Sequence, residues 1–172
     1  MDKMKIDIWS DIACPHCYIG KRRLEKALEQ FPHRKNVELV WHSYELDPSL
    51  PKKTGTQSIY SYFAKKFAMS EDEARRTQAK VAQMAKGVGL DYDFDNLVVV
   101  STSDALRLVK LAKESGLGTE AEEVLFDAYF VKGRNISDPA VLVQLGTSIG
   151  LQETEILAML DSDKYLSEIK KD

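Results

Sequence analysis

Residues 5–24 read Lys-Ile-Asp-Ile-Trp-Ser-Asp-Ile-Ala-Cys-Pro-His-Cys-Tyr-Ile-Gly-Lys-Arg-Arg-Leu, and the tetrapeptide at their centre decides the fold. This tetrapeptide is Cys14-Pro15-His16-Cys17. The residues before it alternate charged and apolar side chains, with the period of two that is typical of a β-strand. The residues after it have a helical pattern. The two cysteines are therefore predicted to lie where a strand turns into a helix.

A second strand is predicted after this helix. The helix runs on from Cys17 with four apolar residues on one face, namely Leu24, Ala27, Leu28 and Phe31. Pro32 prevents its continuation. Residues 36–44 are rich in β-branched and aromatic side chains, which favours a strand. A helix between two strands of one sheet requires the strands to be parallel, with a right-handed crossover.

The rest of the chain is predicted to be a loop followed by helices. Residues 45–57 hold two prolines and a glycine among polar residues, which is typical of a loop. Ser70 with Glu73 is predicted to form a capping box, residues Ser103–Ser115 a helix, and Thr119 with Glu122 a second capping box. Pro139 is predicted to open another helix, capped by Ser137 or Asp138. The stretch over 153–172 is predicted to be helical, with a break at 161–163.

Two parallel strands alone keep open edges. Either the sheet is completed elsewhere or the chain is incomplete.

The composition excludes several classes of function. The chain has 172 residues, a net charge of −3 and 44% hydrophobic residues, enough for a sizeable core. Its short basic runs carry no interleaved aromatic residues, so nucleic acid is not expected as a partner. No apolar run approaches the roughly 18 residues that span a bilayer, and residues 1–5 contain no apolar signal region. We therefore expect a cytoplasmic protein with no membrane partner.

The tetrapeptide favours redox chemistry. At the start of a helix, the Cys14 sulfur lies beside unpaired backbone N–H groups and the positive end of the helix dipole, which stabilise a thiolate. A charged His16 adds to this effect, and Pro15 stiffens the turn. Cys17, one turn on, is the natural resolving thiol. Because a stabilised thiolate favours the reduced pair, we expect the disulfide to be oxidising.

Other interpretations of these residues are weaker. A metal site needs about four ligands, and His33 and His42 are too few to complete one beside a single cysteine pair. Two buried structural cysteines would not require Pro-His between them. His42, on the second strand, is expected to be ordinary packing, although it can also face the active site. Trp9 and Trp41 are expected in the core. The aromatic residues at helical spacing after the loop are expected in the core, with some lining an apolar groove over the cysteines; they are Tyr60, Tyr62, Phe63 and Phe67.

Residues 10–24 resemble the FrnE-like branch of the DsbA family, which also contains 2-hydroxychromene-2-carboxylate isomerase relatives. The resemblance continues through residues 44–48, 103–108, 123–130 and 133–138 and covers essentially the whole chain. It implies an α/β, thioredoxin-like fold that is predominantly helical. Residues 1–50 are then the thioredoxin-like β-α-β portion with the Cys-x-x-Cys motif, residues 51–150 a helical insertion domain, and residues 151–172 a helix leading back to the sheet. By resemblance, Cys14 is the attacking cysteine and Cys17 its partner.

The chain departs from the family pattern in two ways. Members of this branch often carry Trp before the second cysteine, whereas His16 stands here, as in periplasmic DsbA oxidants; this strengthens the oxidising expectation. The family also continues into a Gly-Val-Pro-type segment, whose cis-proline loop faces the cysteines, and into further strands. None of the five prolines of this chain follows Gly-Val. We therefore expect a C-terminally truncated member, in which the C-terminal strands of the sheet are missing or come from a partner in a homo-oligomer.

The resulting functional expectation is a thiol–disulfide oxidoreductase acting through Cys14 and Cys17, with Pro15 and His16 as supporting site residues. No cofactor or metal is expected, and glutathione is a candidate redox partner. The substrate is expected to be a thiol- or disulfide-containing protein or small molecule. One alternative is a glutathione-dependent isomerase of aromatic or polyketide compounds, against which the intact cysteine pair argues. The other is a non-catalytic DsbA-like adaptor whose cysteines form a redox switch.

Overall fold

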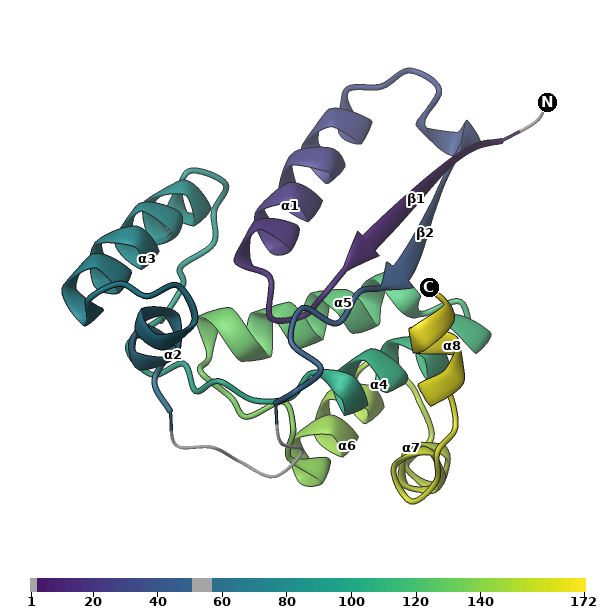
Figure 1. Cartoon of the computed structure of the whole chain (residues 1–172). Coiled ribbons are helices and arrows are strands. Elements are labelled where there is room, and N and C mark those ends of the chain that lie inside the picture. The colour runs from purple at the N-terminus through teal and green to yellow at the C-terminus, as the bar shows by residue number, and fades with distance from the viewer. Residues whose placement is uncertain (1–2, 51–56) are drawn as a thin grey trace.

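The computed structural model describes residues 3–50 and 57–172 of the chain. Within these residues two strands and eight α-helices follow one another (Figure 1). They are β1 (Met4–Ser10), α1 (Pro15–Glu29), β2 (Val37–Ser43), α2 (Ile59–Lys66), α3 (Glu71–Lys86), α4 (Ser103–Glu114), α5 (Gly118–Phe126), α6 (Pro139–Ser148), α7 (Glu153–Leu160) and α8 (Leu166–Lys171). A π-helical turn over Asp127–Val131 continues α5. This is the α/β, predominantly helical architecture that the sequence predicts.

Strands β1 and β2 form a two-stranded parallel sheet within the described residues. The register pairs Ile6 with Leu39 and Ile8 with Trp41. Helix α1 connects the two strands and runs alongside them in Figure 1. The predicted β-α-β unit and its parallel pairing are confirmed. The domain boundaries at residues 50 and 150 stay a prediction.

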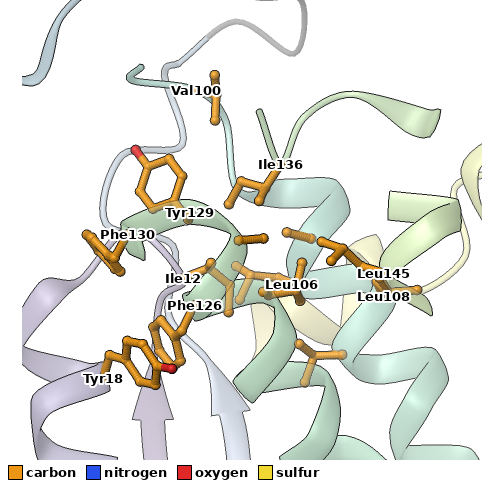
Figure 2. Close-up of a cluster of buried hydrophobic side chains, with 14 of the residues drawn as sticks. Ile12, Tyr18, Val100, Leu106, Leu108, Phe126, Tyr129, Phe130, Ile136 and Leu145 are labelled. Carbon is orange, nitrogen blue, oxygen red and sulfur yellow. The ribbon is translucent and has the colours of Figure 1, made fainter. Parts of the chain in front are cut away.

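Helix α4 lies at the centre of the helical part of the molecule. All of its residues from Ala105 to Ala112 are buried, and helices α5, α6, α7 and α8 pack against it. Figure 2 shows apolar side chains from the β1–α1 turn, α1, α4, α5 and α6 meeting there, among them Ile12, Leu106 and Phe126. The strand unit and the helices therefore share one continuous core.

One buried cation in this core has a clear structural role. The side chain of Arg107 is 1% exposed. Its guanidinium donates to the backbone carbonyl oxygens of Met159, Ser162 and Lys164, with 2.8 Å to the last, and pairs with Asp104. The last carbonyl groups of a helix have no partner within the helix. Arg107 supplies partners at the end of α7, so this buried charge is accounted for.

Two of the predicted helix caps are confirmed and one is wrong. Ser70 and Glu73 form a complete capping box on α3, and the carboxylate of Asp138 accepts from the backbone of α6. Thr119 and Glu122 do not cap α5, which begins at Gly118 after Leu117 and has no side-chain cap. The α4–α5 turn is so tight that a Cβ on Gly118 would lie 2.7 Å from Lys113 Cγ. The helix therefore starts earlier than the pattern indicates, and Glu122 lies inside it.

The burial of α1 also differs from the prediction. The expected face over residues 24–31 is at most half-buried, with Ala27 exposed and Phe31 37% exposed, and the helix ends at Glu29. The fully buried side chains are Tyr18, Ile19 and Lys21 instead. The reason is that α1 packs on the helical core through its first two turns, next to α5.

The two tryptophans have different environments. Trp41 is 3% exposed, as expected of a core residue, whereas Trp9 is 52% exposed, so its predicted burial is wrong. The Trp9 ring stacks on His42 at a centroid distance of 4.6 Å, and His42 Nε2 lies 2.7 Å from the carboxylate of Asp7. These contacts confirm that His42 is a packing residue.

The predicted loop over residues 45–57 is only partly tested. Residues 45–50 contain neither helix nor strand, and the predicted loop residues Pro51 and Gly55 lie outside the described residues. In the described part of the chain no helix is long and apolar enough to span a bilayer.

A pair of glycine substitutions tests the packing of the core. A Cβ on Gly146 would lie 2.5 Å from the buried Ile156 Cδ1, and overpacking of this kind costs about 1–3 kcal/mol. Gly20, exposed on α1, has nothing within 4 Å of its Cβ position, so alanine there gains about 0.5–1 kcal/mol of helix propensity. We expect denaturant unfolding to show Gly146→Ala destabilised and Gly20→Ala stabilised. A stabilised Gly146→Ala would contradict the described packing of α6 on α7.

Candidate active site

The four predicted site residues lie together at the start of α1. Cys14 is the N-cap residue, with an extended backbone, and Pro15 occupies the first turn. The Cys14 N–H donates to the carbonyl of Asp11 at 3.0 Å, and the Cys17 N–H donates to the carbonyl of Cys14 at 3.0 Å. Proline suits this position because its fixed φ matches a helix start and its missing N–H has no partner there anyway. His16 is exposed.

Buried polar groups fix the turn that leads into this helix. Asp11 is 2% exposed, and its carboxylate accepts from the backbone N–H of Leu46 at 2.7 Å and of Ala13 at 3.3 Å. Burial raises the pKa of Asp11, although these bonds oppose the rise. On the other side, the Tyr92 hydroxyl donates to the Pro15 carbonyl at 2.7 Å. The tetrapeptide is therefore held at both ends.

The two cysteines form no disulfide in this structure, and their thiols lie within hydrogen-bond reach of each other. The hydrogen bond from the Cys14 thiol lowers the pKa of Cys17 to about 6, and the same bond raises the pKa of Cys14. A second negative charge so close is unfavourable, so the pair gives up its first proton easily and its second with difficulty. The backbone N–H groups of His16 and Cys17 favour negative charge on Cys14 as well. The site thus stabilises one thiolate, shared between the two sulfurs.

A pocket of about 340 Å³ opens beside one of the two cysteines. The described residues that line it include Cys14, Pro15 and His16 but not Cys17. Opposite them lie Tyr62, Phe63 and Phe67 of the α2 region, with Leu46 and Leu50 from the segment after β2. A ligand in this pocket meets mainly apolar surface and the Cys14 sulfur. The predicted apolar groove is present, and Tyr60, buried elsewhere, is the one aromatic residue of the group that does not line it.

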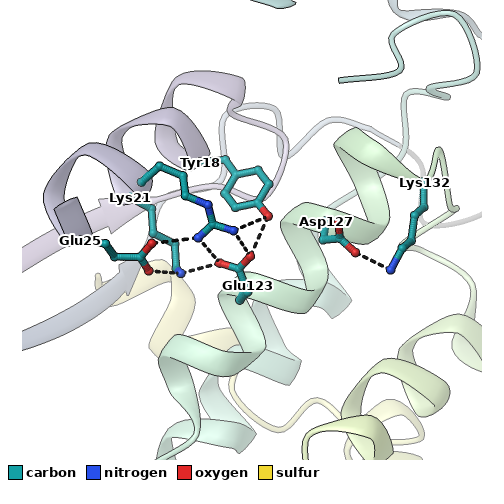
Figure 3. A network of polar contacts seen from close by, with 7 residues as sticks. Tyr18, Lys21, Glu25, Glu123, Asp127 and Lys132 are labelled. Atoms are coloured by element: carbon teal, nitrogen blue, oxygen red, sulfur yellow. Dashed lines mark hydrogen bonds and ion pairs between the residues drawn. The ribbon is translucent and has the colours of Figure 1, made fainter. Parts of the chain in front are cut away.

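An ion-pair network fastens α1 to α5 in the turn of α1 that follows Cys17 (Figure 3). The Glu123 carboxylate accepts from the Tyr18 hydroxyl at 2.7 Å, from Lys21 Nζ at 2.5 Å and from the Arg22 guanidinium. Lys21 Nζ also bonds Glu25 at 2.5 Å. Burial acts against ionisation of Glu123, but the bonds from Arg22, Lys21 and Tyr18 prevail and hold its pKa at about 2. The network places the first two turns of α1, and with them the cysteines.

Sequence reasoning missed four residues that shape this site: Asp11, Tyr92, Glu122 and Glu123. Asp11 lies three residues before Cys14, and an Asx turn there was a readable signal. The other three come from distant segments and carry no local signal. Glu122 is 1% exposed, and its burial is the main cause that raises its pKa to about 8. The charges of Cys17 and Asp11 also raise this pKa, whereas those of Lys21 and Lys113 lower it.

The residues present offer no site for a resident metal ion in the described part of the chain. No group of three or more His, Cys, Asp or Glu side chains is placed to hold an ion in residues 3–50 and 57–172. The chemistry that the site can perform with its own groups is that of the two thiols.

A parallel β-α-β unit with Cys-x-x-Cys at the first turn of its helix, joined to a larger helical part, defines a thioredoxin-like domain with a helical insertion. Residues 5–172 match the family model of the DSBA-like thioredoxin domain, and the chain belongs to this family.

A solved structure at 37% identity supports this assignment, and a curated relative is similar over most of the chain. A probable DsbA oxidoreductase from Streptomyces coelicolor has a TM-score of 0.92 and 37% identity, covering 98% of this chain and 73% of its own. The Bacillus subtilis (strain 168) protein YwbO is 28% identical over 161 residues, which are 93% of this chain and 73% of YwbO. The cytosolic disulfide reductase DsbM of Pseudomonas aeruginosa shares the fold, with a TM-score of 0.66 and 18% identity over 98% of this chain and 77% of DsbM.

The Glu123 network makes a prediction about stability and pH. Replacing Glu123 by Gln leaves the buried Lys21 with a weaker partner, at a cost of about 1–3 kcal/mol. Because the pKa of Glu123 is held at about 2 in the folded chain and is about 4.3 in an unfolded one, its stabilisation is present above pH ~4.3 and is lost as the pH falls toward 2. Thermal unfolding should show a large difference in Tm between wild type and Glu123→Gln at neutral pH, about half of it near pH ~3 and a small one near pH ~2.

The exposed Glu120 on the same helix provides the matched control. Glu120→Gln should change Tm little at any pH. Equal effects of the two substitutions would show that the α1–α5 network does not stabilise the fold.

Proposed function

We propose that this chain is a thiol–disulfide oxidoreductase that forms or exchanges disulfides through Cys14 and Cys17. The observation that carries the proposal is the asymmetry of the pair: Cys14 lines the pocket, whereas Cys17 is absent from the residues that line it. A substrate in the pocket therefore meets Cys14, and Cys17 lies behind it within hydrogen-bond reach of the same sulfur. This is the arrangement that an attacking and a resolving thiol need.

The exchange follows from this geometry. In the oxidising direction a substrate thiolate attacks the Cys14 sulfur of the disulfide, the bond between Cys14 and Cys17 breaks, and its electron pair goes to the Cys17 sulfur. A second substrate thiolate then attacks the substrate sulfur of the mixed disulfide, and Cys14 leaves as a thiolate. The substrate loses two electrons and the cysteine pair gains them. The lowered pKa of Cys17 stabilises the thiolate that forms when the disulfide opens, so the pair is expected to oxidise substrates readily.

The proposed substrates carry a thiol or disulfide next to apolar groups, in a protein or a small molecule. The pocket wall of Tyr62, Phe63 and Phe67 supports this preference. Glutathione is proposed as a redox partner and the cytoplasm as the location. Both proposals draw support from DsbM, a cytosolic disulfide reductase whose structure was solved with GSH.

Trapping the mixed disulfide tests the proposed roles. With glutathione disulfide as the probe, the Cys17→Ser variant should accumulate one glutathione on Cys14, because the resolving thiol is gone. Wild type should clear this adduct by closing its own disulfide, and Cys14→Ser should form little adduct, since Cys17 is not in the pocket. Intact-mass and peptide mass spectrometry locate the adduct. An adduct on Cys17 of Cys14→Ser, with none on Cys14 of Cys17→Ser, would reverse the roles.

The pocket wall makes a separate prediction about substrate preference. Phe67 is 53% exposed and lines the pocket, so Phe67→Ala removes apolar contact with little effect on the core. Losing about 1–2 kcal/mol of such contact should raise KM roughly tenfold for a disulfide peptide with an apolar flank. KM for a glycine-flanked peptide should change little. Phe31→Ala, at an exposed site outside the pocket, is the control. Equal KM values for both peptides in Phe67→Ala would contradict an apolar docking role.

A further inference from the structure

Helix α3 carries one polar side chain on its buried face. Its buried residues are Ala74, Gln78, Val81 and Ala85, which recur at intervals of three and four residues and so form one stripe along the helix. Glutamine is mostly exposed in folded proteins, yet Gln78 is 2% exposed. An apolar residue would be expected at this position of the stripe.

No partner within the fold accounts for the Gln78 amide. In the part of the chain that the structure describes, its Oε1 atom is buried and has no hydrogen-bond partner. Native proteins rarely leave a buried polar atom unpaired, and each such group calls for an explanation. An apolar side chain of similar shape would serve the packing as well or better, because it has no polar group to leave unpaired. The fold therefore gains nothing from an amide at this position.

Gln78 lines the apolar pocket beside the cysteines. Other polar residues that line the pocket have partners within the protein. The buried Asp11 carboxylate binds backbone N–H groups and the Thr102 hydroxyl, and the Tyr62 hydroxyl donates to Asp47 at 2.5 Å. Among the described residues that line the pocket, the buried polar atom without a partner is Gln78 Oε1.

The Gln78 amide offers the pocket one polar anchor in largely apolar surroundings. The last torsion of a glutamine side chain is broad, so the amide can turn to present its carbonyl acceptor or its NH₂ donor. The pocket wall includes Ile59, Val81, Val99 and Val100. A ligand group that suits this wall has an apolar body and a single polar tip. A peptide amide suits it less well, because it has two polar groups and would leave one unpaired.

A phenol has the required form. Its ring is apolar and packs well against aromatic side chains, and such side chains form part of the pocket wall, namely Tyr62, Phe63 and Phe67. Its hydroxyl both donates and accepts, so it can pair with either end of the Gln78 amide. The pocket volume of about 340 Å³ lies within the range of small-ligand sites.

We propose that Gln78 is a specificity-determining residue, which binds a phenolic hydroxyl that the substrate carries near its reacting sulfur. The phenol is a tyrosine close to a cysteine in a peptide, or the ring of a small hydroxyaryl thiol. This inference deepens the proposed function and rests on it, because Cys14 lines the same pocket.

The Gln78→Leu variant tests this role with two peptide disulfides that differ only in a tyrosine or a phenylalanine beside the cysteine. The readout is kcat/KM for their reduction by the reduced chain, with glutathione as the source of electrons. Wild type should prefer the tyrosine peptide about tenfold. Gln78→Leu should prefer the phenylalanine peptide, because a wholly apolar pocket leaves the hydroxyl unpaired.

The exposed Gln83 on the same helix provides the matched control. Gln83→Leu should keep the preference of wild type for the tyrosine peptide. Equal kcat/KM for the two peptides in wild type, or an unchanged tyrosine preference in Gln78→Leu, would overturn the proposal.

Small disulfides distinguish the two sources of the phenol. The disulfides of para-hydroxyphenethyl thiol and of phenethyl thiol repeat the comparison without a peptide. A preference for the hydroxyl in both series would show that the ring alone is recognised, and a preference in the peptides alone would assign the pocket to a tyrosine. No preference in either series would contradict the role of Gln78.

The stability of Gln78→Leu separates binding from a structural role. Because the Gln78 Oε1 atom has no partner in the fold, denaturant unfolding should show Gln78→Leu at least as stable as wild type. A clear loss of stability would show that the amide has a structural partner and would overturn the proposal.

Binding without chemistry separates this inference from the proposed function and needs no variant. N-acetyltyrosinamide and N-acetylphenylalaninamide contain no sulfur, and NMR titration of wild type should show the tyrosine compound binding more tightly, with shifts at Gln78 and Val81. This preference in a chain that exchanges with no disulfide would refute the proposed function alone. Exchange with both peptide disulfides at equal rates, without a preference in binding, would refute the role of Gln78 alone.

Discussion

The packing of Tyr18 on Phe126 is the contact on which the rest of the site depends. The two rings lie nearly parallel with centroids 4.9 Å apart, and the Tyr18 hydroxyl reaches past Phe126 to Glu123. Tyr18 follows Cys17 directly, so whatever fixes its ring also fixes the first turn of α1. Because the rings are buried, the contact combines apolar burial with a defined angle between the helices. On the partly exposed side of this contact, the ion pairs of Glu123 with Lys21 and Arg22 also hold α1 against α5.

The contact between α1 and α5 brings the start of α1, with its two thiols, next to a helix that is far away in the sequence. The strand unit provides the helix start, and α5 provides Glu123, to which the first two turns of α1 are bonded. Neither part has the whole site: the cysteine pair would lose this support without α5, and the apolar pocket would lack its wall without α2. The π-helical turn after α5 also contributes to the site, because its Tyr129 lines the pocket. Short π-helical segments are frequent at functional sites.

The sequence predicts the parts of this structure that depend on local patterns. Alternating side chains define β1, the spacing of Cys14 and Cys17 at a strand–helix junction defines the Cys-x-x-Cys motif, and Ser70 with Glu73 defines the start of α3. The structure confirms these features because the interactions that produce them join residues only a few positions apart in the sequence. The family assignment follows from the same motif and from the helical pattern after it.

The parts that could not be predicted are decided by distant contacts. Thr119 and Glu122 have the spacing of a capping box, but the close approach of Gly118 to Lys113 starts α5 earlier and turns Glu122 inward. Tryptophan usually fills a core, yet the Trp9 side chain is exposed and stacks on His42. The predicted apolar face over residues 24–31 lies on α1, but only the first two turns of that helix, before residue 24, meet α5. Hydrophobic periodicity identifies a helix reliably, but it does not say which stretch of that helix finds a partner.

The most direct test of the account is the ionisation of the thiols in the reduced chain. Thiolate ultraviolet absorbance, followed across pH in wild type, Cys14→Ala and Cys17→Ala, reports each proton that the pair loses. We predict a first ionisation in wild type well below the value of about 8.5 for a free thiol, and a higher pKa in both single variants, because alanine cannot donate the hydrogen bond that joins the two sulfurs. Two ordinary ionisations in wild type, matching those of the single variants, would show that the cysteines do not act as a pair and would contradict a redox site at the start of α1.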